Sequence, residues 1–423
     1  MRALYAAPLG ADFWKLWTAS AVTNLGDGIT MVAGPLLVAS ITTNPAAVAG
    51  AVLAQQLPWL LFALISGAWA DRLDRRRLVV AVNVLRACTL AVLAAAAAAD
   101  MATVPLILAV FFLLGTGETL ADTASAAFVP AIVAEPLRPR ANSLMYANFN
   151  LLNQFAAKPV GGWLFVLAAA APFAVNAVTF AVSALLLSTI RAVSPHRATP
   201  AAPAGAGAQS APVVVAEPAR PGLLAEIGDG LRWLLRHRIL RTLAVTMAVG
   251  NVVFCAAFAI FVLYAAQRLG LTDVGYGLLL VAFAVGGLLG TLVAPPLIRR
   301  VNAAALLRSG LLVEVALHTT LTLTREPWIA AAMIVVFGIH TTVWGVVVTT
   351  IRQRDVPPAM YGRVAGVYSF LDLGGAALGS LLGGLVATAY GLVATYGTAA
   401  AAMALVGAAA WRPLKAATLE RHL

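Results

Sequence analysis

Hydrophobic positions along this chain form long, almost uninterrupted runs that short polar stretches separate. Each run is long enough to cross the ~30 Å hydrocarbon core of a bilayer as a helix, since about 20 residues at 1.5 Å each suffice. The runs are 14–41, 46–69, 78–99, 103–127, 142–169, 171–191, 239–265, 274–298, 303–324, 327–350, 361–388 and 391–411. The pattern therefore predicts an all-α membrane protein with twelve transmembrane helices.

The runs divide six and six around residues 192–222. Of those 31 residues, 19 are Ala, Pro or Gly, which bury too little large apolar surface to fold. We expect an N-terminal six-helix half at 1–191, a flexible cytoplasmic linker at 192–222 and a C-terminal half at 223–423. The C-terminal half opens with Leu223–Arg241, whose apolar and charged residues lie on opposite helical faces. This predicts an interfacial helix on the inner leaflet before the seventh span.

Composition agrees with this picture and explains a net charge that would otherwise suggest nucleic acid as a partner. With 61% hydrophobic residues, 11% charged residues and a mean hydropathy of +0.90, the chain is not a soluble globular protein. If the N-terminus is cytoplasmic, 24 of the 28 Lys and Arg residues lie on the inner side. The positive-inside rule then puts both termini in the cytoplasm and accounts for the formal charge of +11 without nucleic acid.

Several classes of chemistry are excluded by what the chain lacks. Cys88 and Cys255 both fall inside apolar runs, so we expect neither a disulfide framework nor a metal site. No phosphate-cradling glycine loop with its Lys-Ser or Lys-Thr is present, which excludes ATP hydrolysis as the energy source. No serine has a plausible base at hand, and no small-residue cleavage site marks a removable signal peptide. We therefore expect neither an enzyme nor a cofactor.

A strongly charged turn joins the second and third runs. Four arginines and two aspartates within 71–77 cannot lie in hydrocarbon, so a tight cytoplasmic turn is expected, and an ordinary orienting loop is the simplest interpretation. The order of residues, however, resembles the signature loop between helices 2 and 3 of the major facilitator superfamily. The residues that carry this resemblance, and that become candidates for a gate, are Gly67, Asp71, Arg72, Arg75, Arg76 and Arg77, with Asp74 where the superfamily usually has glycine.

Further stretches extend the resemblance over nearly the whole chain. Pro130–Leu144 and Thr350–Val364 are similar to segments that follow spans 4 and 10 in the bacterial multidrug and siderophore exporter branch. Residues 158–162 (KPVGG) resemble the antiporter signature, with lysine where glycine is usual. The resemblance implies the major facilitator fold, with two six-helix halves and the substrate path between them. It also implies that spans 1, 4, 7 and 10 line the cavity while spans 3, 6, 9 and 12 support it.

Ionisable residues inside the predicted spans are the candidates for chemistry, because each costs about 2.5–3.5 kcal/mol at the membrane centre. On the spans that the resemblance assigns to the cavity, Asp27, Glu118 and His340 could face substrate. Lys158 and Asp372 could lie between the halves, either neutralising each other or paired separately. A hydrogen bond at a helix bend is the alternative for Asp27, and a packing role is the alternative for His340.

For three other ionisable residues, a structural role is the favoured interpretation. Asp122, one turn after Glu118, is expected to pair with the arginines at 72–77 and so belongs with the gate. Glu314 and His318 are one turn apart on a supporting span, which favours a satisfied local pair.

We therefore expect a secondary active transporter of the cytoplasmic (inner) membrane of a bacterium. The hypothesis is a monomeric, proton-coupled exporter of a small amphipathic molecule (a drug, siderophore or other natural product) that works by alternating access. Its partners would be that substrate, protons and the lipid bilayer, and a desolvated carboxylate, which binds a proton readily, would provide coupling. A lysophospholipid flippase or a small-solute importer of the same fold is an alternative, and a non-transporting membrane sensor or scaffold is another.

The charged turn yields a first prediction. If Asp71 and the arginines hold the two halves together while the outer side is open, Asp71→Asn loses charge-assisted contacts to a helix end. Transport should fall with little loss of expression. Efflux in vesicles, compared at equal amounts of protein, measures the change, and normal transport by Asp71→Asn would contradict the gating interpretation.

Overall fold

The structure of the protein is a computed structural model that describes residues 9–72, 74–125, 128–190 and 223–414. It describes no side chains at 63–72, 135, 139, 223–227, 358–359, 361–362, 365 and 369. The predicted linker at 192–222 lies outside the described residues, so that expectation stays a prediction.

Every regular element of the described chain is a helix, which confirms the all-α class. The first half contains α2 (Ala11–Ile41), α3 (Pro45–Arg72), α4 (Arg75–Ala98), α5 (Val104–Ser125), α6 (Phe128–Ile132), η1 (Glu135–Leu137), α7 (Arg138–Asn148), η2 (Phe149–Ala156), α8 (Ala157–Leu167) and α9 (Ala171–Ser188). The second half contains α10 (Leu223–Arg236), α11 (Arg238–Ala259), α12 (Phe261–Gln267), α13 (Asp273–Arg300), α14 (Ala303–Leu323), α15 (Pro327–Asp355), α16 (Pro358–Tyr390) and α17 (Leu392–Trp411).

The described residues contain eleven helical segments that are long and apolar enough to cross a membrane. The expected fifth span, 142–169, is the exception, because it consists of α7, the π-helical η2 and α8 in succession. Polar side chains compete for backbone groups there: Asn150 Nδ2 donates to Tyr146 O at 2.8 Å, and Asn148 Nδ2 donates to Trp17 O in α2 at 3.0 Å. A hydropathy run carries no sign of such a change in helical hydrogen bonding.

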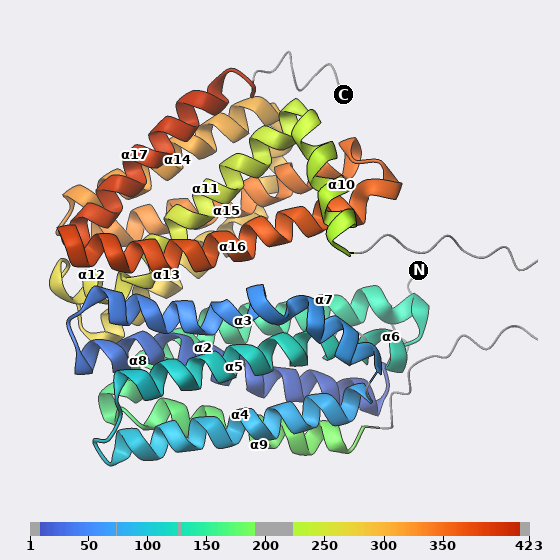
Figure 1. Ribbon diagram of the computed structural model, residues 1–423, viewed down its shortest axis with the longest axis vertical. Coiled ribbons are helices and arrows are strands. Elements are labelled where there is room, and N and C mark those ends of the chain that lie inside the picture. The colour runs from blue at the N-terminus through green and yellow to red at the C-terminus, as the bar shows by residue number, and fades with distance from the viewer. Residues whose placement is uncertain (1–8, 73, 126–127, 191–222, 415–423) are drawn as a thin grey trace, which may run out of the picture.

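The helices form two groups, α2–α9 and α10–α17, which lie one above the other in Figure 1. We call the end of the molecule at which α9 stops and α10 starts the linker end, and the opposite end the distal end. At the distal end, on the left of Figure 1, α12 of the second half contacts α2 of the first. The two halves are therefore joined away from the linker.

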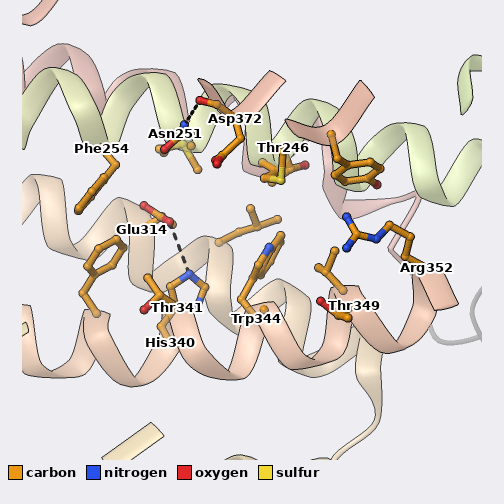
Figure 2. A pocket seen from close by; sticks show the side chains of 18 of the residues that line it. Thr246, Asn251, Phe254, Glu314, His340, Thr341, Trp344, Thr349, Arg352 and Asp372 are labelled. Atoms are coloured by element: carbon orange, nitrogen blue, oxygen red, sulfur yellow. Dashed lines mark hydrogen bonds and ion pairs between the residues drawn. The ribbon is translucent and has the colours of Figure 1, made fainter. Parts of the chain in front are cut away.

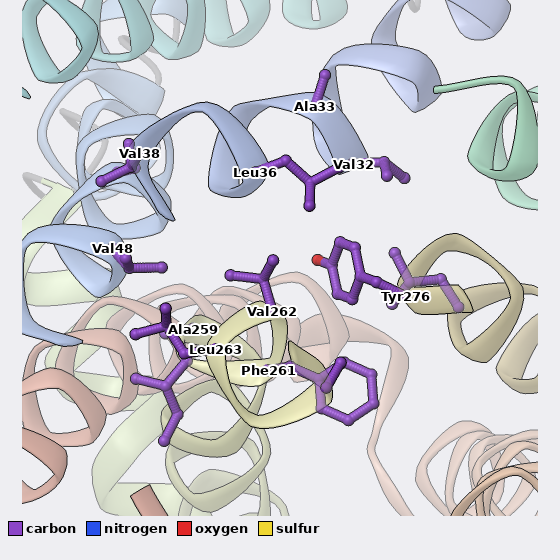
Figure 3. Packing of buried hydrophobic residues seen from close by; sticks show 14 of the residues in the cluster. Val32, Ala33, Leu36, Val38, Val48, Ala259, Phe261, Val262, Leu263 and Tyr276 are labelled. Carbon is purple, nitrogen blue, oxygen red and sulfur yellow. The ribbon is translucent and has the colours of Figure 1, made fainter. Parts of the chain in front are cut away.

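A cluster of buried hydrophobic residues spans both halves at the distal end. Val32 of α2 and Val48 of α3 contribute from the first half, while Val262 and Leu263 of α12 contribute from the second (Figure 3). All four side chains are at most 3% exposed. Because no water reaches these side chains, the packing between the halves at this end is as complete as in the core of one domain.

Glycines allow the halves to approach closely in two further places. At Gly384 of α16 a Cβ would lie 2.7 Å from the Ala49 Cβ of α3, and at Gly162 of α8 it would lie 2.8 Å from the Asp273 O of α13. Thr388 Oγ1 also donates to Asn44 Oδ1 across the same boundary at 3.4 Å. Small residues here let membrane helices meet backbone to backbone, and their smooth surfaces suit an interface that has to open.

The glycines of α16 also give a stability prediction. A Cβ at Gly383 would lie 2.2 Å from the Ala256 O of α11, whereas a Cβ at Gly374 on the same helix meets nothing within 4 Å. Gly383→Ala should lower the melting temperature of the purified protein, because overpacking typically costs about 1–3 kcal/mol. Gly374→Ala is the matched control and should melt like the unchanged protein. Equal melting temperatures for both variants would mean that the contact between α11 and α16 relaxes without cost.

Candidate functional site

Three adjoining cavities lie along the boundary between the halves. The N-half cavity, of about 250 Å³, is lined by Asp27 and Glu118. The central cavity, of about 290 Å³, is lined by Lys158, and the C-half cavity, of about 370 Å³, by His340 and Asp372. The central cavity shares lining residues with both neighbours, namely Met31, Gln56, Gln154 and Phe258 on one side and Phe254, Phe283 and Phe337 on the other. The five residues predicted to face substrate or to lie between the halves thus line one series of cavities.

An ion pair joins α4 to Asp27 of α2, one of the residues that line the N-half cavity. Arg86 Nη2 donates to Asp27 Oδ1 at 3.2 Å, and the two side chains are 6% and 30% exposed. Asn176 of α9 interacts electrostatically with the Asp27 side chain as well, while its Nδ2 donates to Thr30 Oγ1 of α2 at 2.7 Å. Asp27 is therefore held by partners from two other helices while part of it still faces the cavity.

The packing around Arg86 explains how a guanidinium is held between helices. Its Cζ lies 4.0 Å from the centre of the Phe180 ring in α9, a distance at which the aromatic face attracts the cation. On the other side lies Gly117 of α5, where a Cβ would come within 2.9 Å of the Arg86 Cγ and Cδ atoms. Glycine at this position is what allows α5 to lie against the arginine stem.

Two more carboxylates stand close to this ion pair on α5. Glu118 lines the N-half cavity beside the Gln55 side chain of α3, which lines it too. Asp122 lies one turn nearer the linker end and is exposed. It makes no hydrogen bond or ion pair with a described side chain, and the Arg72 side chain, one of its predicted partners, lies outside the described residues. Both carboxylates interact electrostatically with Arg86.

Lys158 stands at the start of α8, directly after the π-helical segment. Its side chain is 2% exposed, and Nζ donates to Gln154 Oε1 at 2.7 Å. The α8 backbone beside it packs on α13, since a Cβ at Gly277 would lie 3.0 Å from the Lys158 O. The lysine is thus at the boundary between the halves, as the sequence suggests, but its described partner is an amide rather than Asp372.

The C-half cavity contains a contact between a histidine and a carboxylate that the sequence analysis did not anticipate. His340 Nε2 of α15 lies 3.5 Å from Glu314 Oε1 of α14 (Figure 2). The expected local pair between Glu314 and His318 is wrong in its geometry. His318 is fully buried, and its Nδ1 is 2.9 Å from the backbone oxygen of Glu314 rather than from the carboxylate. The Glu314 side chain is therefore free to turn toward α15.

Asp372 lies on the opposite wall of the same cavity. Asn251 Nδ2 of α11 donates to the backbone oxygen of Asp372, and the Asp372 side chain is exposed toward the cavity (Figure 2). Arg352 lines the linker end of the cavity, with its Cζ 4.9 Å from the centre of the Tyr368 ring.

The predicted gate is only partly described. Asp74 caps α4, because its Oδ1 accepts a hydrogen bond from the Arg77 N at 3.0 Å, so an aspartate ends one helix and starts the next where the superfamily usually has glycine. Arg76 Nη1 donates to the Ile190 O at 2.7 Å, at the end of α9. These contacts lie within the first half. Arg75 begins α4. The surroundings of Gly67 and the side chains of Asp71 and Arg72 lie outside what the structure describes.

Two functional candidates were missed by sequence reasoning, Arg86 and Glu314. Both lie well inside apolar runs, and the cost of a charge in that position is the signal that could have identified them. From the sequence, Glu314 is interpreted as half of a local pair on a supporting span, and no role is named for Arg86 on the third span, which is also a support in the superfamily. In this structure the side chains reach from those supports into the cavities or to their lining residues.

Comparison with known proteins agrees with this geometry. The sequence model of the transmembrane secretion effector family matches residues 4–420. The multidrug efflux pump Tap of Mycolicibacterium fortuitum is 29% identical over 401 residues, which cover 93% of each chain. A bacterial homologue of the iron transporter ferroportin in an inward-facing state is similar with a TM-score of 0.73 and 17% identity, covering 97% of this chain and 100% of that chain. A bacterial homologue of ferroportin in an outward-facing state, with soaked iron, is similar with a TM-score of 0.54 and 16% identity. The match covers 95% of this chain and 99% of that chain.

The Arg86–Asp27 pair predicts a specific pattern of stability. Arg86→Gln leaves Asp27 without its ionic partner, and breaking a buried pair typically costs about 3–5 kcal/mol. The double variant Asp27→Asn/Arg86→Gln removes both charges and should melt closer to the unchanged protein than Arg86→Gln does. Thermal unfolding of the purified variants measures this. A double variant that is less stable than Arg86→Gln would show that the two side chains do not act as a pair.

Proposed function

We propose that the protein exports a small amphipathic molecule in exchange for protons. The premise is that the chain belongs to the transmembrane secretion effector family of major facilitator transporters. Membership of this family makes the protein a membrane transporter and not an enzyme, as the sequence predicts. Export is supported by the similarity to Tap, an efflux pump, over 93% of both chains. The cytoplasmic membrane of a bacterium is the place in which such an exporter would act, as a monomer.

The proposed orientation places the linker end in the cytoplasm, with α7, η2 and α8 together making a twelfth crossing. The positive-inside rule supports it, since 24 of 28 Lys and Arg residues then lie on the cytoplasmic side. In that orientation the distal packing would close the outer side, as in an inward-facing state. The higher similarity to an inward-facing than to an outward-facing transporter supports the same state.

The observation that carries proton coupling is an excess of carboxylates over cations beside the N-half cavity. Asp27, Glu118 and Asp122 interact electrostatically with one another and with the same guanidinium, that of Arg86. A single cation cannot neutralise three carboxylates. Asp122 is exposed, whereas Glu118 is only partly exposed, so Glu118 is the carboxylate for which a charge without an ionic partner is costly. Because Asp27 is already paired with Arg86, a proton on Glu118 removes part of the excess charge.

Exchange follows if the two states of the transporter hold that proton with different affinity. In the outward-open state Glu118 would take a proton from outside, and in the inward-open state it would release the proton to the cytoplasm while substrate enters. Only a difference in affinity between the states can drive the cycle, so the exposure of Glu118 to water has to change as the halves move. The glycine contacts at the distal end, including Gly162 and Gly384, are the surfaces that would separate.

The cavities also support an amphipathic substrate. Phe254, Phe258, Phe283 and Phe337 line the middle of the series, while carboxylates stand in the cavities at both ends. A molecule with an apolar body and a polar end would match such a path, because apolar area buries favourably and the polar group keeps a partner.

The coupling proposal predicts distinct outcomes for transport and for exchange. Glu118→Gln mimics the protonated side chain, so it should keep substrate exchange and lose accumulation that depends on the proton gradient. Asp27→Asn should weaken the same dependence, since it releases Arg86 to interact with Glu118. Inside-out membrane vesicles with an acid interior, compared with and without the gradient, measure both quantities.

A matched control for this experiment is Glu326→Gln, which removes a carboxylate from the turn between α14 and α15, outside the three cavities. It should transport like the unchanged protein. If Asp27→Asn and Glu118→Gln both keep full gradient dependence, neither residue couples protons, and Asp372 becomes the leading candidate.

A further inference from the structure

The C-half cavity contains a carboxylate that proton coupling, as proposed above, does not use. The Glu314 side chain is 14% exposed, and its contact with His340 is 3.5 Å long, beyond the usual range of 2.7–3.2 Å for a nitrogen donor. Its second oxygen, Oε2, is buried and has no hydrogen-bond partner among the described residues. A carboxylate can accept about four hydrogen bonds, so Glu314 has acceptor capacity left for a ligand.

No fixed cation near Glu314 takes up this capacity among the described residues that line the cavity. Arg352 lies at the other end of the cavity in Figure 2, over the Tyr368 ring. His340 is the ionisable neighbour on α15, and His318 is bound to the Glu314 backbone. Asp372 on the facing wall adds a second carboxylate. The electrostatic field around Glu314 therefore favours a positive charge.

An aromatic wall continues from this carboxylate toward the central cavity. The Phe254 ring lies 5.7 Å from the Phe337 ring and 6.0 Å from the Phe283 ring, measured between centroids. On the other side of the histidine, the Trp344 ring is 5.7 Å from the His340 ring in an edge-to-face arrangement. Aromatic rings offer stacking surface to a flat ligand and attract a cation over their faces.

The size of the space agrees with a small organic molecule. The C-half cavity has about 370 Å³, and it shares three lining phenylalanines with the central cavity of about 290 Å³. Ligand sites in proteins commonly measure about 300–1,000 Å³. An anion placed here would meet Glu314 and Asp372, and a neutral ring would leave the Glu314 Oε2 without a partner.

We propose that the C-half cavity binds an organic cation with an aromatic ring, with Glu314 as its counter-ion and Trp344 and the phenylalanines against its ring. The inference rests on the proposed exporter function and adds the class of substrate and the place at which it binds. His340 competes for the same carboxylate in the empty site, so the histidine gives way when the cation enters.

The test measures binding without any gradient, on the full chain purified in detergent. The probe is ethidium, a permanent cation with a fluorescent aromatic ring system, and its uncharged ring system, phenanthridine, is the matched comparison. Ethidium should bind saturably, and Glu314→Gln should weaken it about tenfold or more, as expected for the loss of about 1.4 kcal/mol or more of charge-assisted binding. Phenanthridine binding should not depend on the charge at position 314.

Three further variants keep the proposal falsifiable if Glu314→Gln does not fold. Glu314→Asp keeps the charge and should recover most of the ethidium affinity, while Glu326→Gln removes a carboxylate elsewhere and should change nothing. Trp344→Leu keeps every charge and should weaken ethidium several-fold. Size-exclusion profiles and melting temperatures establish that each variant is folded.

Three results would overturn the proposal. They are no saturable ethidium binding to the unchanged protein, equal affinities for Glu314→Gln and Glu326→Gln, and unaltered affinity in a folded Trp344→Leu variant. The coupling proposal is tested separately in vesicles. Gradient-driven export of an uncharged or anionic compound, without ethidium binding, would refute the substrate class alone, whereas ethidium binding without gradient dependence would refute coupling alone.

Discussion

Hydrocarbon around this protein does not solvate charge, and this constraint decides where its ionisable side chains lie. Arg86 shows the solution most clearly: it is 6% exposed between α2, α5 and α9, paired with Asp27 and covered by the Phe180 ring. The residues before it on α4, Val84 and Leu85, are 48% and 55% exposed, as suits a lipid-facing surface. Charge is thus turned inward, and the two halves enclose a polar interior between apolar outer faces.

The same constraint explains how much the sequence could predict. Long apolar runs have to be helices in a membrane, so the positions of most helices follow from hydropathy alone. The π-helical η2 does not follow from hydropathy. Asn148, the residue just before it, donates a hydrogen bond to the backbone of α2. Hydrogen bonds of that kind are tertiary, and a run of hydropathy carries no information on them.

The interaction partners of the ionisable residues in the cavities were equally hard to predict, although the ionisable residues themselves were not. A charged residue inside an apolar run is easy to recognise, because placing it in the membrane costs free energy. The five residues predicted to face substrate or to lie between the halves all line the cavities. Their partners come from distant parts of the chain, as Arg86 does for Asp27 and His340 does for Glu314. The sequence favoured His318 for Glu314 because one helical turn separates them, yet a side chain one turn away can bind the backbone instead.

The separation of the two ionic sites has a consequence for how transport can work. Asp27 and Glu118 belong to the first half, whereas Glu314 and His340 belong to the second, and the central cavity with its phenylalanines lies between them. A proton at one site and a cation at the other do not compete for the same oxygen atoms. Exchange of a proton for a cation would therefore require a part of the structure that both sites influence. The packing between the two halves is such a part. The buried contact of Val32 and Val48 with α12 would have to break for the outer side to open, so each proposed ligand would act by altering the free-energy cost of breaking it.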